Sequence, residues 1–184
     1  EVSEDGTTYT FHIRSDATFH DGSPVTADDV VFTVQLAQNQ DIKSPRRVDW
    51  EGVTATAQDE RTVIFTLPHA YAPFLETTQL GILPKHLWDG VLPDEFPFHT
   101  LNTHPVGSGP YQIEEIISND AGTPLSYELS SFPEFTLGRP HIESITFKFY
   151  TNEEALMDAF NKSIINSFAG ISAESLALTE RTDT

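Results

Sequence analysis

Short stretches in which apolar and polar residues alternate recur along this chain, and they constrain its fold more than any other feature. The alternation is found at residues 7–14, 53–57, 63–67 and 142–150. A period of two places every second side chain on the same face of a β-strand. Turn residues separate the stretches, so 51–67 is expected to form a hairpin that turns at Asp59-Glu60. Residues 111–117 and 125–131 are expected to form a second hairpin, with its turn at 119–124.

Two other segments have helical spacing. Thr26 precedes Asp28 and Asp29, and a capping residue followed by carboxylates predicts a helix start. This helix should run to about Asn39. Residues 152–162 predict a second main helix, with a buried stripe at Ala155, Leu156, Ala159 and Phe160. Residues 172–178 are expected to start one more helix, and the polar tail 179–184 to be frayed.

Proline shapes the middle of the chain. Seven prolines stand at positions 68, 73, 84, 93, 97, 105 and 110. Proline breaks helices because it lacks the N–H group and its ring clashes with the preceding turn. We therefore expect 68–110 to wrap the sheet as an irregular connection, with short helices near 71–78 and 84–89. The fold class predicted is α+β, with a mostly antiparallel sheet and two main helices.

Composition excludes several functions. The chain has 28 acidic residues against 10 Lys and Arg, a net charge of −18, and its longest basic run is Arg46-Arg47. Such a surface repels phosphate backbones, so nucleic-acid binding is not expected. The absence of cysteine removes disulfides, cysteine-zinc sites and thiol nucleophiles. The seven histidines form no metal-binding motif, so we expect no metal and no other cofactor.

Two loop motifs invite catalytic interpretations. His20 and Asp21 lie in Phe19-His20-Asp21-Gly22-Ser23-Pro24, but no nucleophile accompanies them, and a tight turn is the better interpretation. Pro105-Val106-Gly107-Ser108-Gly109-Pro110-Tyr111 lacks the lysine of a phosphate-binding loop and the flanking glycines of a hydrolase elbow, so it too is predicted to be a turn. The many acids leave a carboxylate-based hydrolase as the alternative function.

The order of the motifs resembles one known family. Tyr9-Thr10-Phe11-His12-Ile13-Arg14, then Ala17 to Val30, then Ile82 to Leu87 and the glycine motif at 105–111, resemble the family 5 extracellular solute-binding proteins. Gly138 to Ile142 and the strand and helix that follow also match. The likeness runs from about residue 5 to residue 178. One departure is Ser163-Ile164-Ile165-Asn166, where the family usually has Gly-Glu-Ile-Asp, which puts the turn after the helix in question.

The resemblance implies a fragment of a two-lobed receptor of the periplasmic-binding-protein type (type II, cluster C). Residues 1–184 would form the bulk of the small subdomain of the first lobe, with bordering strands of the main sheet. The implied function is the solute-binding component of an ABC importer, not an enzyme. Its implied partners are a peptide or other small solute, the ABC permease and the remainder of its own receptor chain, and it is expected to be a monomer. It would lie outside the cytoplasmic membrane, periplasmic or lipid-anchored, with a signal peptide upstream of Glu1.

The ligand contacts implied by the resemblance lie in two loops. In peptide-binding relatives a Ser-Pro pair is followed by an aromatic residue that reaches the ligand, and here Arg46 takes that place, with Arg47 beside it. A guanidinium suits an anionic group of a ligand. The alternative, which so acidic a surface favours, is that the arginine pair is a local counter-charge for nearby acids. Thr78, Gln79 and Leu80 form the second candidate segment.

Overall fold

The chain forms two compact units. The computed structural model describes residues 1–176. The first unit comprises Glu1–Gln112 and Ser131–Ile142, and the second comprises Ile113–Ser130 and the chain from Glu143 onward. The last two residues of the helix expected at 172–178, and the tail 179–184, lie outside the described residues.

The first unit is built on a three-stranded antiparallel sheet. Strands β1 (Thr8–His12), β2 (Thr54–Ala57) and β3 (Thr62–Thr66) lie in the order β1-β3-β2, so the predicted hairpin forms and β1 pairs with its second strand. Tyr9 lies opposite Phe65, which also faces Ala55. The alternation in the sequence thus places the rings of Tyr9 and Phe65 in the core, where both are at least 95% buried.

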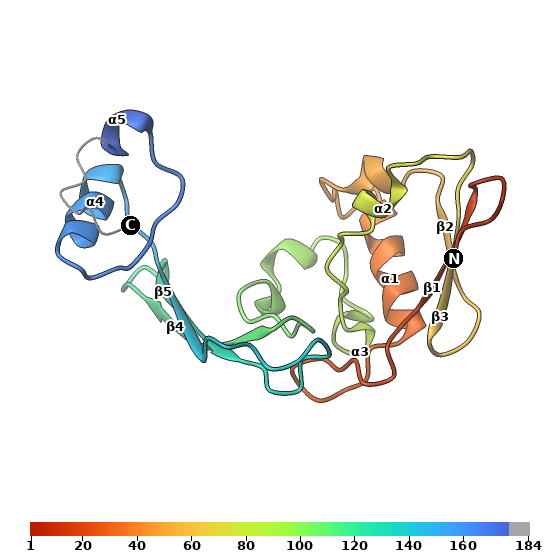
Figure 1. Ribbon diagram of the computed structural model, residues 1–184, viewed down its shortest axis with the longest axis horizontal. Coiled ribbons are helices and arrows are strands. Elements are labelled where there is room, and N and C mark those ends of the chain that lie inside the picture. The colour runs from red at the N-terminus through yellow and green to blue at the C-terminus, as the bar shows by residue number, and fades with distance from the viewer. Residues whose placement is uncertain (177–184) are drawn as a thin grey trace. The chain divides into compact units, whose positions relative to one another are not determined.

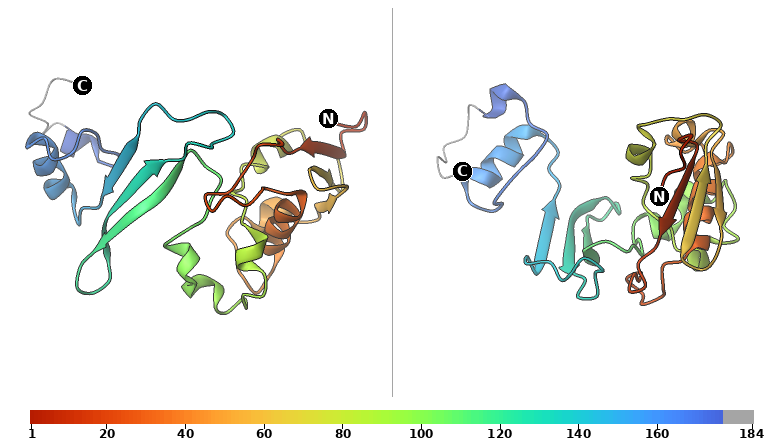
Figure 2. Two further views of the ribbon diagram at one scale, coloured as in Figure 1. Left: turned by 90° about the horizontal axis from the view of Figure 1, so that it is seen from below. Right: turned by 45° about the vertical axis from the view of Figure 1, so that its right-hand side comes forward.

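Helix α1 (Ala27–Gln38) packs against this sheet (Figures 1 and 2). It begins where the sequence predicts, because Thr26 and Asp29 form a reciprocal capping box. Val34 and Ala37 are buried among the aromatic rings of Trp50, Phe65 and Phe74, whose centroids lie 5.6–5.8 Å apart. Offset and edge-to-face rings of this kind stabilise a core beyond their buried area alone.

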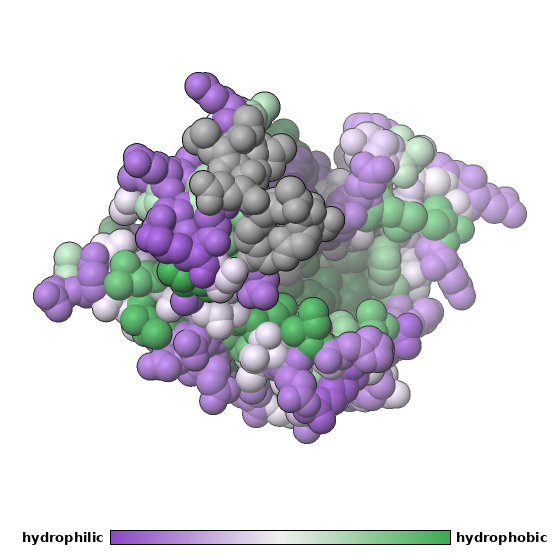
Figure 3. All heavy atoms as spheres, turned by 60° about the vertical axis from the view of Figure 1, so that its left-hand side comes forward, coloured by the Kyte–Doolittle hydropathy of each residue, from purple (hydrophilic) through white to green (hydrophobic). Residues whose placement is uncertain are grey.

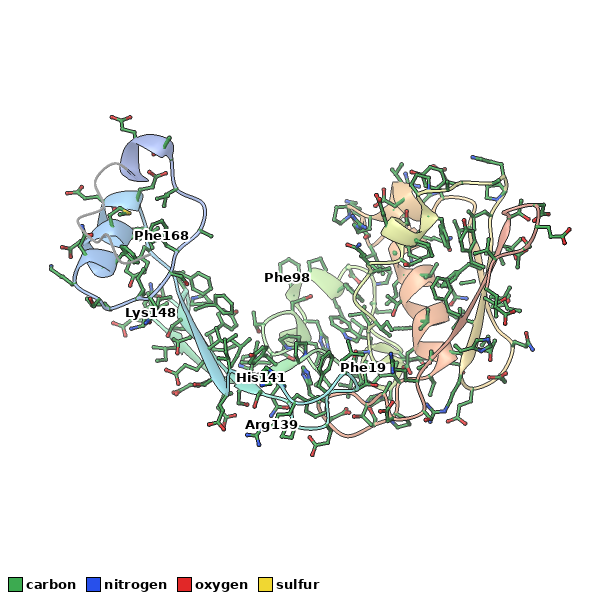
Figure 4. The ribbon with its side chains drawn as sticks, in the orientation of Figure 1. Phe19, Phe98, Arg139, His141, Lys148 and Phe168 are labelled. Carbon is green, nitrogen blue, oxygen red and sulfur yellow. The ribbon has the colours of Figure 1, made fainter. Side chains whose placement is uncertain are left out.

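The proline-rich connection contains only short helices, as expected. They are α2 (Phe74–Thr77), α3 (Lys85–Trp88) and the 3₁₀ turns η2 (Phe96–Phe98) and η3 (Thr100–Asn102), and the turn η1 (Arg47–Trp50) precedes them. Buried Phe74, Pro84 and Trp88 attach this segment to the first unit. Phe98 of η2 is an exception, because 87% of it is exposed (Figure 4).

Strands β4 (Tyr111–Ser118), β5 (Pro124–Ser131) and β6 (Ser144–Lys148) form a second sheet in the order β4-β5-β6. The hairpin turns at 119–123, as predicted, and β6 pairs antiparallel with β5. Phe147 of β6 and Phe149, which directly follows the strand, do not lie in a core, because each is 52% exposed. Figure 3 likewise shows hydrophobic residues (green) at the surface among hydrophilic ones (purple). Alternation therefore predicted the strand correctly, and the structure adds that its apolar face is largely exposed in this chain.

Helix α4 (Glu153–Asn161) lies in the second unit, followed by α5 (Ala173–Leu176). Its predicted buried stripe is partly wrong: Ala159 and Phe160 are buried, but Met157 replaces Ala155 and Leu156, which are only partly buried. Ring packing sets this rotation, because Phe160 contacts Phe168 with centroids 4.7 Å apart. Met157, three residues earlier, shares the face of Phe160.

The turn after α4 keeps its geometry although the expected glycine is replaced. Ser163 adopts a left-handed backbone conformation with φ 58°. Its N–H donates to the carbonyl of Phe160, and the N–H of Ile164 donates to the carbonyl of Ala159. These two bonds form a Schellman motif, which normally has glycine at this position. Ser163 therefore adopts a conformation that is strained for a residue other than glycine, and the chain still forms a turn of the glycine type.

Candidate functional site

The five candidate contact residues all lie in the first unit, but they line three separate hollows. Arg46 and Gln79 share an open polar depression with Asp49, Tyr71, Pro73, Glu76 and Thr77. Thr78 and Leu80 line an apolar cavity beside α1. Arg47 lines a third depression, next to β2. The structure thus brings Arg46 and Gln79 together across more than thirty residues of sequence, and it separates Arg47 from both.

Arg46 already has an acidic neighbour. Its Nε lies 3.2 Å from Oδ2 of Asp49, and the two side chains are 44% and 42% exposed. An exposed pair of this kind contributes at most about 1 kcal/mol, because water and salt screen it. The guanidinium therefore remains open to exchange between Asp49 and an anionic ligand group. The loop is shaped by Ser44, whose hydroxyl oxygen accepts from the Arg46 N–H at 3.2 Å.

Arg47 lies beside a rigid segment. The side-chain amide of Gln38 donates to the carbonyl oxygens of Trp50 and Val53, at 2.7 and 2.6 Å. These bonds fix the chain between η1 and β2 to the end of α1. Arg47 shares its depression with Gln38 and Glu51. With these polar side chains, the depression suits a polar group of a ligand.

The apolar cavity lies where α1 meets the sheet. It is partly open to solvent and has a volume of about 220 Å³. Its lining residues come from β1 and the residue after it, from α1, η1 and β3, and from the segment before α3: Phe11, His12, Ile13, Val30, Thr33, Val34, Trp50, Val63, Phe65, Thr78, Leu80 and Ile82. Sequence reasoning identified Thr78 and Leu80 but missed Trp50 and the α1 residues, because no local motif marks them.

The two loop motifs bind each other. We name 19–24 the histidine turn and 105–110 the glycine loop. The Gly107 N–H donates to Nδ1 of His20 at 3.2 Å, and Nε2 of His20 lies 3.0 Å from the Gly109 carbonyl oxygen. A neutral imidazole with its proton on Nε2 satisfies both contacts. The His20 ring also packs edge-on against Phe132, with centroids 5.0 Å apart. His20 is therefore a structural residue that joins the two turns.

The histidine turn has the geometry that the sequence predicts. Gly22 has φ 84°, a left-handed conformation that glycine adopts without strain. Oδ1 of Asp21 accepts from the N–H and the hydroxyl of Ser23, and its Oδ2 lies 2.7 Å from Nε2 of His86. Partial burial opposes ionisation of Asp21, but the bonds from Ser23 and His86 outweigh it and lower the pKa of this carboxyl below its usual value.

A buried carboxylate, that of Asp29 at the start of α1, positions the loop before α3. Asp29 is 95% buried, and its Oδ1 accepts from the N–H of Lys85 at 2.8 Å. One turn later, the Thr33 hydroxyl donates to the Asp29 carbonyl and accepts from the N–H of Leu83. These bonds hold Ile82 and Leu80 against the cavity, so two polar residues of α1 shape one of its walls.

Residues 1–176 contain neither a cluster of metal-binding side chains nor a helix suited to span a membrane. Among them, no three His, Asp or Glu side chains are grouped so as to hold a metal ion. His99 packs against Trp88, with ring centroids 5.1 Å apart. No helix in this part of the chain has both the length and the apolar character needed to cross a bilayer.

Comparison with known proteins supports the resemblance that the order of the motifs indicated. The model of the bacterial extracellular solute-binding proteins, family 5 Middle, matches residues 1–184. Protein XP55 of Streptomyces lividans is 38% identical over 114 residues, which are 61% of this chain and 20% of that protein. The chain spans about a fifth to a third of the length of these curated relatives, which include a putative ABC transporter peptide-binding protein of Brucella ovis at 27% identity over 168 residues, 90% of this chain and 31% of that protein.

Solved structures resemble the fold over most of the chain. The oligopeptide-binding protein AppA of Bacillus subtilis, solved with a nonapeptide, has a TM-score of 0.80 at 26% identity, covering 90% of this chain and 33% of that one. NikZ of Campylobacter jejuni, solved with Ni(L-His), has a TM-score of 0.79 at 25% identity, covering 90% of this chain and 32% of that one. The fold class expected from the sequence, part of a two-lobed binding protein, is therefore confirmed.

Proposed function

This chain belongs to the bacterial extracellular solute-binding proteins of family 5, and from that membership we propose that it is part of the solute receptor of an ABC importer. The receptor captures a peptide or a similar small solute outside the cytoplasmic membrane and delivers it to the permease. The observation that carries the proposal is the match of the family model over all 184 residues. The mutual hydrogen bonds of the histidine turn and the glycine loop support it, because they give the two motifs a joint structural role.

The proposed receptor is larger than this chain. The chain covers 33% of the AppA chain that it resembles, so the remainder of the receptor supplies most of the solute site. The exposed apolar residues Phe147 and Phe149 support a role for that remainder in covering the second sheet. We expect residues 1–184 alone to bind no cognate solute measurably. The whole receptor is proposed to act as a monomer, periplasmic or lipid-anchored at the cell surface.

The proposed solute contacts remain Arg46, Arg47, Thr78, Gln79 and Leu80. Of these, Arg46 has the clearest chemistry, because a solute carboxylate can replace Asp49 on its guanidinium. Gln79 lines the same depression and offers an amide donor and acceptor beside it.

Calorimetry on the full-length receptor tests this proposal, with a peptide library and nickel chelates as titrants. Arg46→Ala is expected to weaken binding of an anionic solute about tenfold or more. Arg14→Ala serves as the matched control, since Arg14 is exposed and lines none of the three hollows. Equal affinities of the wild type and Arg46→Ala would remove Arg46 from the site. Turnover of a titrant, abolished by replacing a carboxylate pair, would favour the hydrolase alternative instead.

A further inference from the structure

His20 can join the histidine turn to the glycine loop only while its ring is uncharged. The Gly107 N–H donates to Nδ1, so Nδ1 carries no proton, and Nε2 donates to the Gly109 carbonyl oxygen. A protonated imidazole carries a hydrogen on both nitrogens. Its Nδ1–H would point at the Gly107 N–H, and two donors form no hydrogen bond. Because the ring is rigid, turning Nδ1 away from Gly107 also moves Nε2 away from Gly109.

The ring contacts the two stretches at which the chain leaves the first unit and returns to it. The chain leaves this unit after residue 112 and returns at residue 131. The glycine loop ends two residues before the departure, and Phe132, on which the His20 ring packs edge-on, is the second residue after the return. The Phe132 N–H donates to the carbonyl of Pro110 at 2.8 Å, so the two stretches also bind each other. A change in the charge of His20 therefore acts where the first unit is connected to the rest of the chain.

Three carboxylates line an open depression together with His20. They belong to Asp16, Asp21 and Glu134. Oδ1 of Asp16 accepts from the Thr136 hydroxyl at 2.9 Å. The glycine loop and Phe132 bring no titratable side chain to the ring, so the titratable groups that line this depression with His20 are all acids. Nearby carboxylates stabilise the charged form of an imidazole, and they offer a protonated ring a partner in place of the loop.

The neighbouring pair of His86 and Asp21 responds to a proton in the opposite sense. Nε2 of His86 lies 2.7 Å from Oδ2 of Asp21, and protonation of His86 strengthens this contact by adding charge. Partial burial raises the pKa of Asp21, but its bonds from Ser23 and His86 outweigh burial and lower the pKa below its usual value. Asp21 thus stays ionised where imidazoles normally titrate, between about pH 5 and about pH 8. The stability of the whole unit mixes two opposite responses, so a local measurement is needed to isolate that of His20.

We propose that His20 is a pH-dependent latch. The neutral ring holds the glycine loop against the histidine turn, and the protonated ring leaves the loop and turns to the carboxylates of Asp16 and Glu134. The bond from the His20 N–H to the Gly107 carbonyl, at 2.8 Å, involves no ring atom, so acid loosens the loop without detaching it. The proposal goes beyond the receptor function and does not rest on it, because it follows from the contacts of one side chain.

NMR of the chain with ¹⁵N-labelled histidine tests the proposal between about pH 8 and about pH 5. At the alkaline end the ring shifts of His20 are expected to identify the tautomer with its proton on Nε2, and at the acidic end the doubly protonated ring. Over the same titration, protection of the Gly107 N–H from hydrogen exchange, relative to an unstructured peptide at each pH, should fall about fivefold, because its hydrogen bond is lost. A proton on Nδ1 at the alkaline end, a ring that stays neutral throughout, or constant protection would overturn the proposal.

Two matched variants locate the origin of the response. His20→Asn keeps an oxygen acceptor for the Gly107 N–H but does not titrate, so protection of that N–H should no longer depend on pH. His86→Gln keeps an N–H donor for Asp21 and removes the other titrating ring, so the response of Gly107 should persist. A response that persists in His20→Asn or disappears in His86→Gln would refute the latch. Thermal melting verifies that each variant is folded, and the wild-type titration decides by itself if His20→Asn is not.

A third variant tests the role of the carboxylates. Asp16→Asn combined with Glu134→Gln removes two charges that favour the protonated ring and keeps the shape of both side chains. At about pH 5 this variant should retain more of the Gly107 protection than the wild type, because less of the ring is protonated. An equal loss of protection would overturn the assignment of these two acids as partners of the protonated ring.

Discussion

Two adjacent carboxylates at the start of α1 have very different structural roles, and replacing each with alanine tests that difference. Asp29 is 95% buried and accepts three hydrogen bonds: from the N–H and hydroxyl of Thr26, at 2.8 and 2.6 Å, and from the N–H of Lys85, at 2.8 Å. The side chain of Asp28 is 67% exposed and lies 3.7 Å from the Lys85 ammonium. Sequence patterns alone treat the two residues as equivalent.

The expected magnitudes follow from these contacts. Hydrogen bonds to a charged group contribute roughly 1.5–3 kcal/mol each, but removing the carboxylate also removes the cost of burying it. We therefore expect Asp29→Ala to lower the free energy of unfolding by about 2–4 kcal/mol, less than the sum of three bonds. Asp28→Ala should cost less than about 1 kcal/mol, because it loses only an exposed ion pair and a helix-dipole interaction.

Urea denaturation followed by tryptophan fluorescence measures both variants. The chain has two tryptophans, Trp50 and Trp88, and both belong to the first unit, so the signal reports on the unit that contains α1. If the free energy of unfolding keeps the same dependence on urea concentration, the urea midpoint should fall clearly for Asp29→Ala and little for Asp28→Ala. Similar losses in the two variants would refute the argument that burial and the bond to Lys85, not the charge at the helix start, give Asp29 its importance.

Four further predictions concern other parts of the chain. His20→Phe, which loses both bonds to the glycine loop, should destabilise the first unit by about 1–3 kcal/mol in the same urea assay, whereas His69→Phe at an exposed position should not. The pKa of Asp21 is lowered in the folded chain, so its stabilisation is present above its unfolded pKa and is lost as the pH falls below about 4; acid titration of Asp21→Asn should lack this loss. Ser163→Gly should stabilise the turn after α4 by about 1 kcal/mol, measured as slower hydrogen exchange of the Ile164 N–H, and faster exchange would contradict the strain argument. Because the net charge is −18, the melting temperature should be higher in about 1 M NaCl than in about 0.1 M NaCl, since the screening length falls from roughly 10 Å to roughly 3 Å. A lower melting temperature in the higher salt, measured by calorimetry, would argue against charge repulsion.

The exposed strand β6 shows where sequence reasoning about the fold reaches its limit. Alternation predicted the strand correctly, since a period of two is a local property of the backbone. It does not say whether the apolar face of the strand is buried, and here Phe147 and Phe149 are half exposed. Burial depends on what packs against a face, and no local pattern contains that information.

The candidate site has the same limit. The resemblance selected Arg46 and Gln79, which the fold does bring to one depression. It grouped Arg47 with Arg46 because they are adjacent in sequence, but the backbone turn at η1 directs them into different depressions. Trp50 carried no sequence signal, because an unpaired indole N–H can be recognised only when the positions of all possible acceptors are known.

The sequence by itself determined the features of this chain that depend on neighbouring residues. The cap at Thr26, the hairpin turns, the short helices between prolines and the turn at Gly22 all follow from local backbone preferences. The tertiary structure decided which of two acids beside that cap is buried, which glycines His20 binds and which side chains enclose the cavity. These outcomes join residues that are 50 or more positions apart, and such contacts form only when packing of the whole core brings distant segments together.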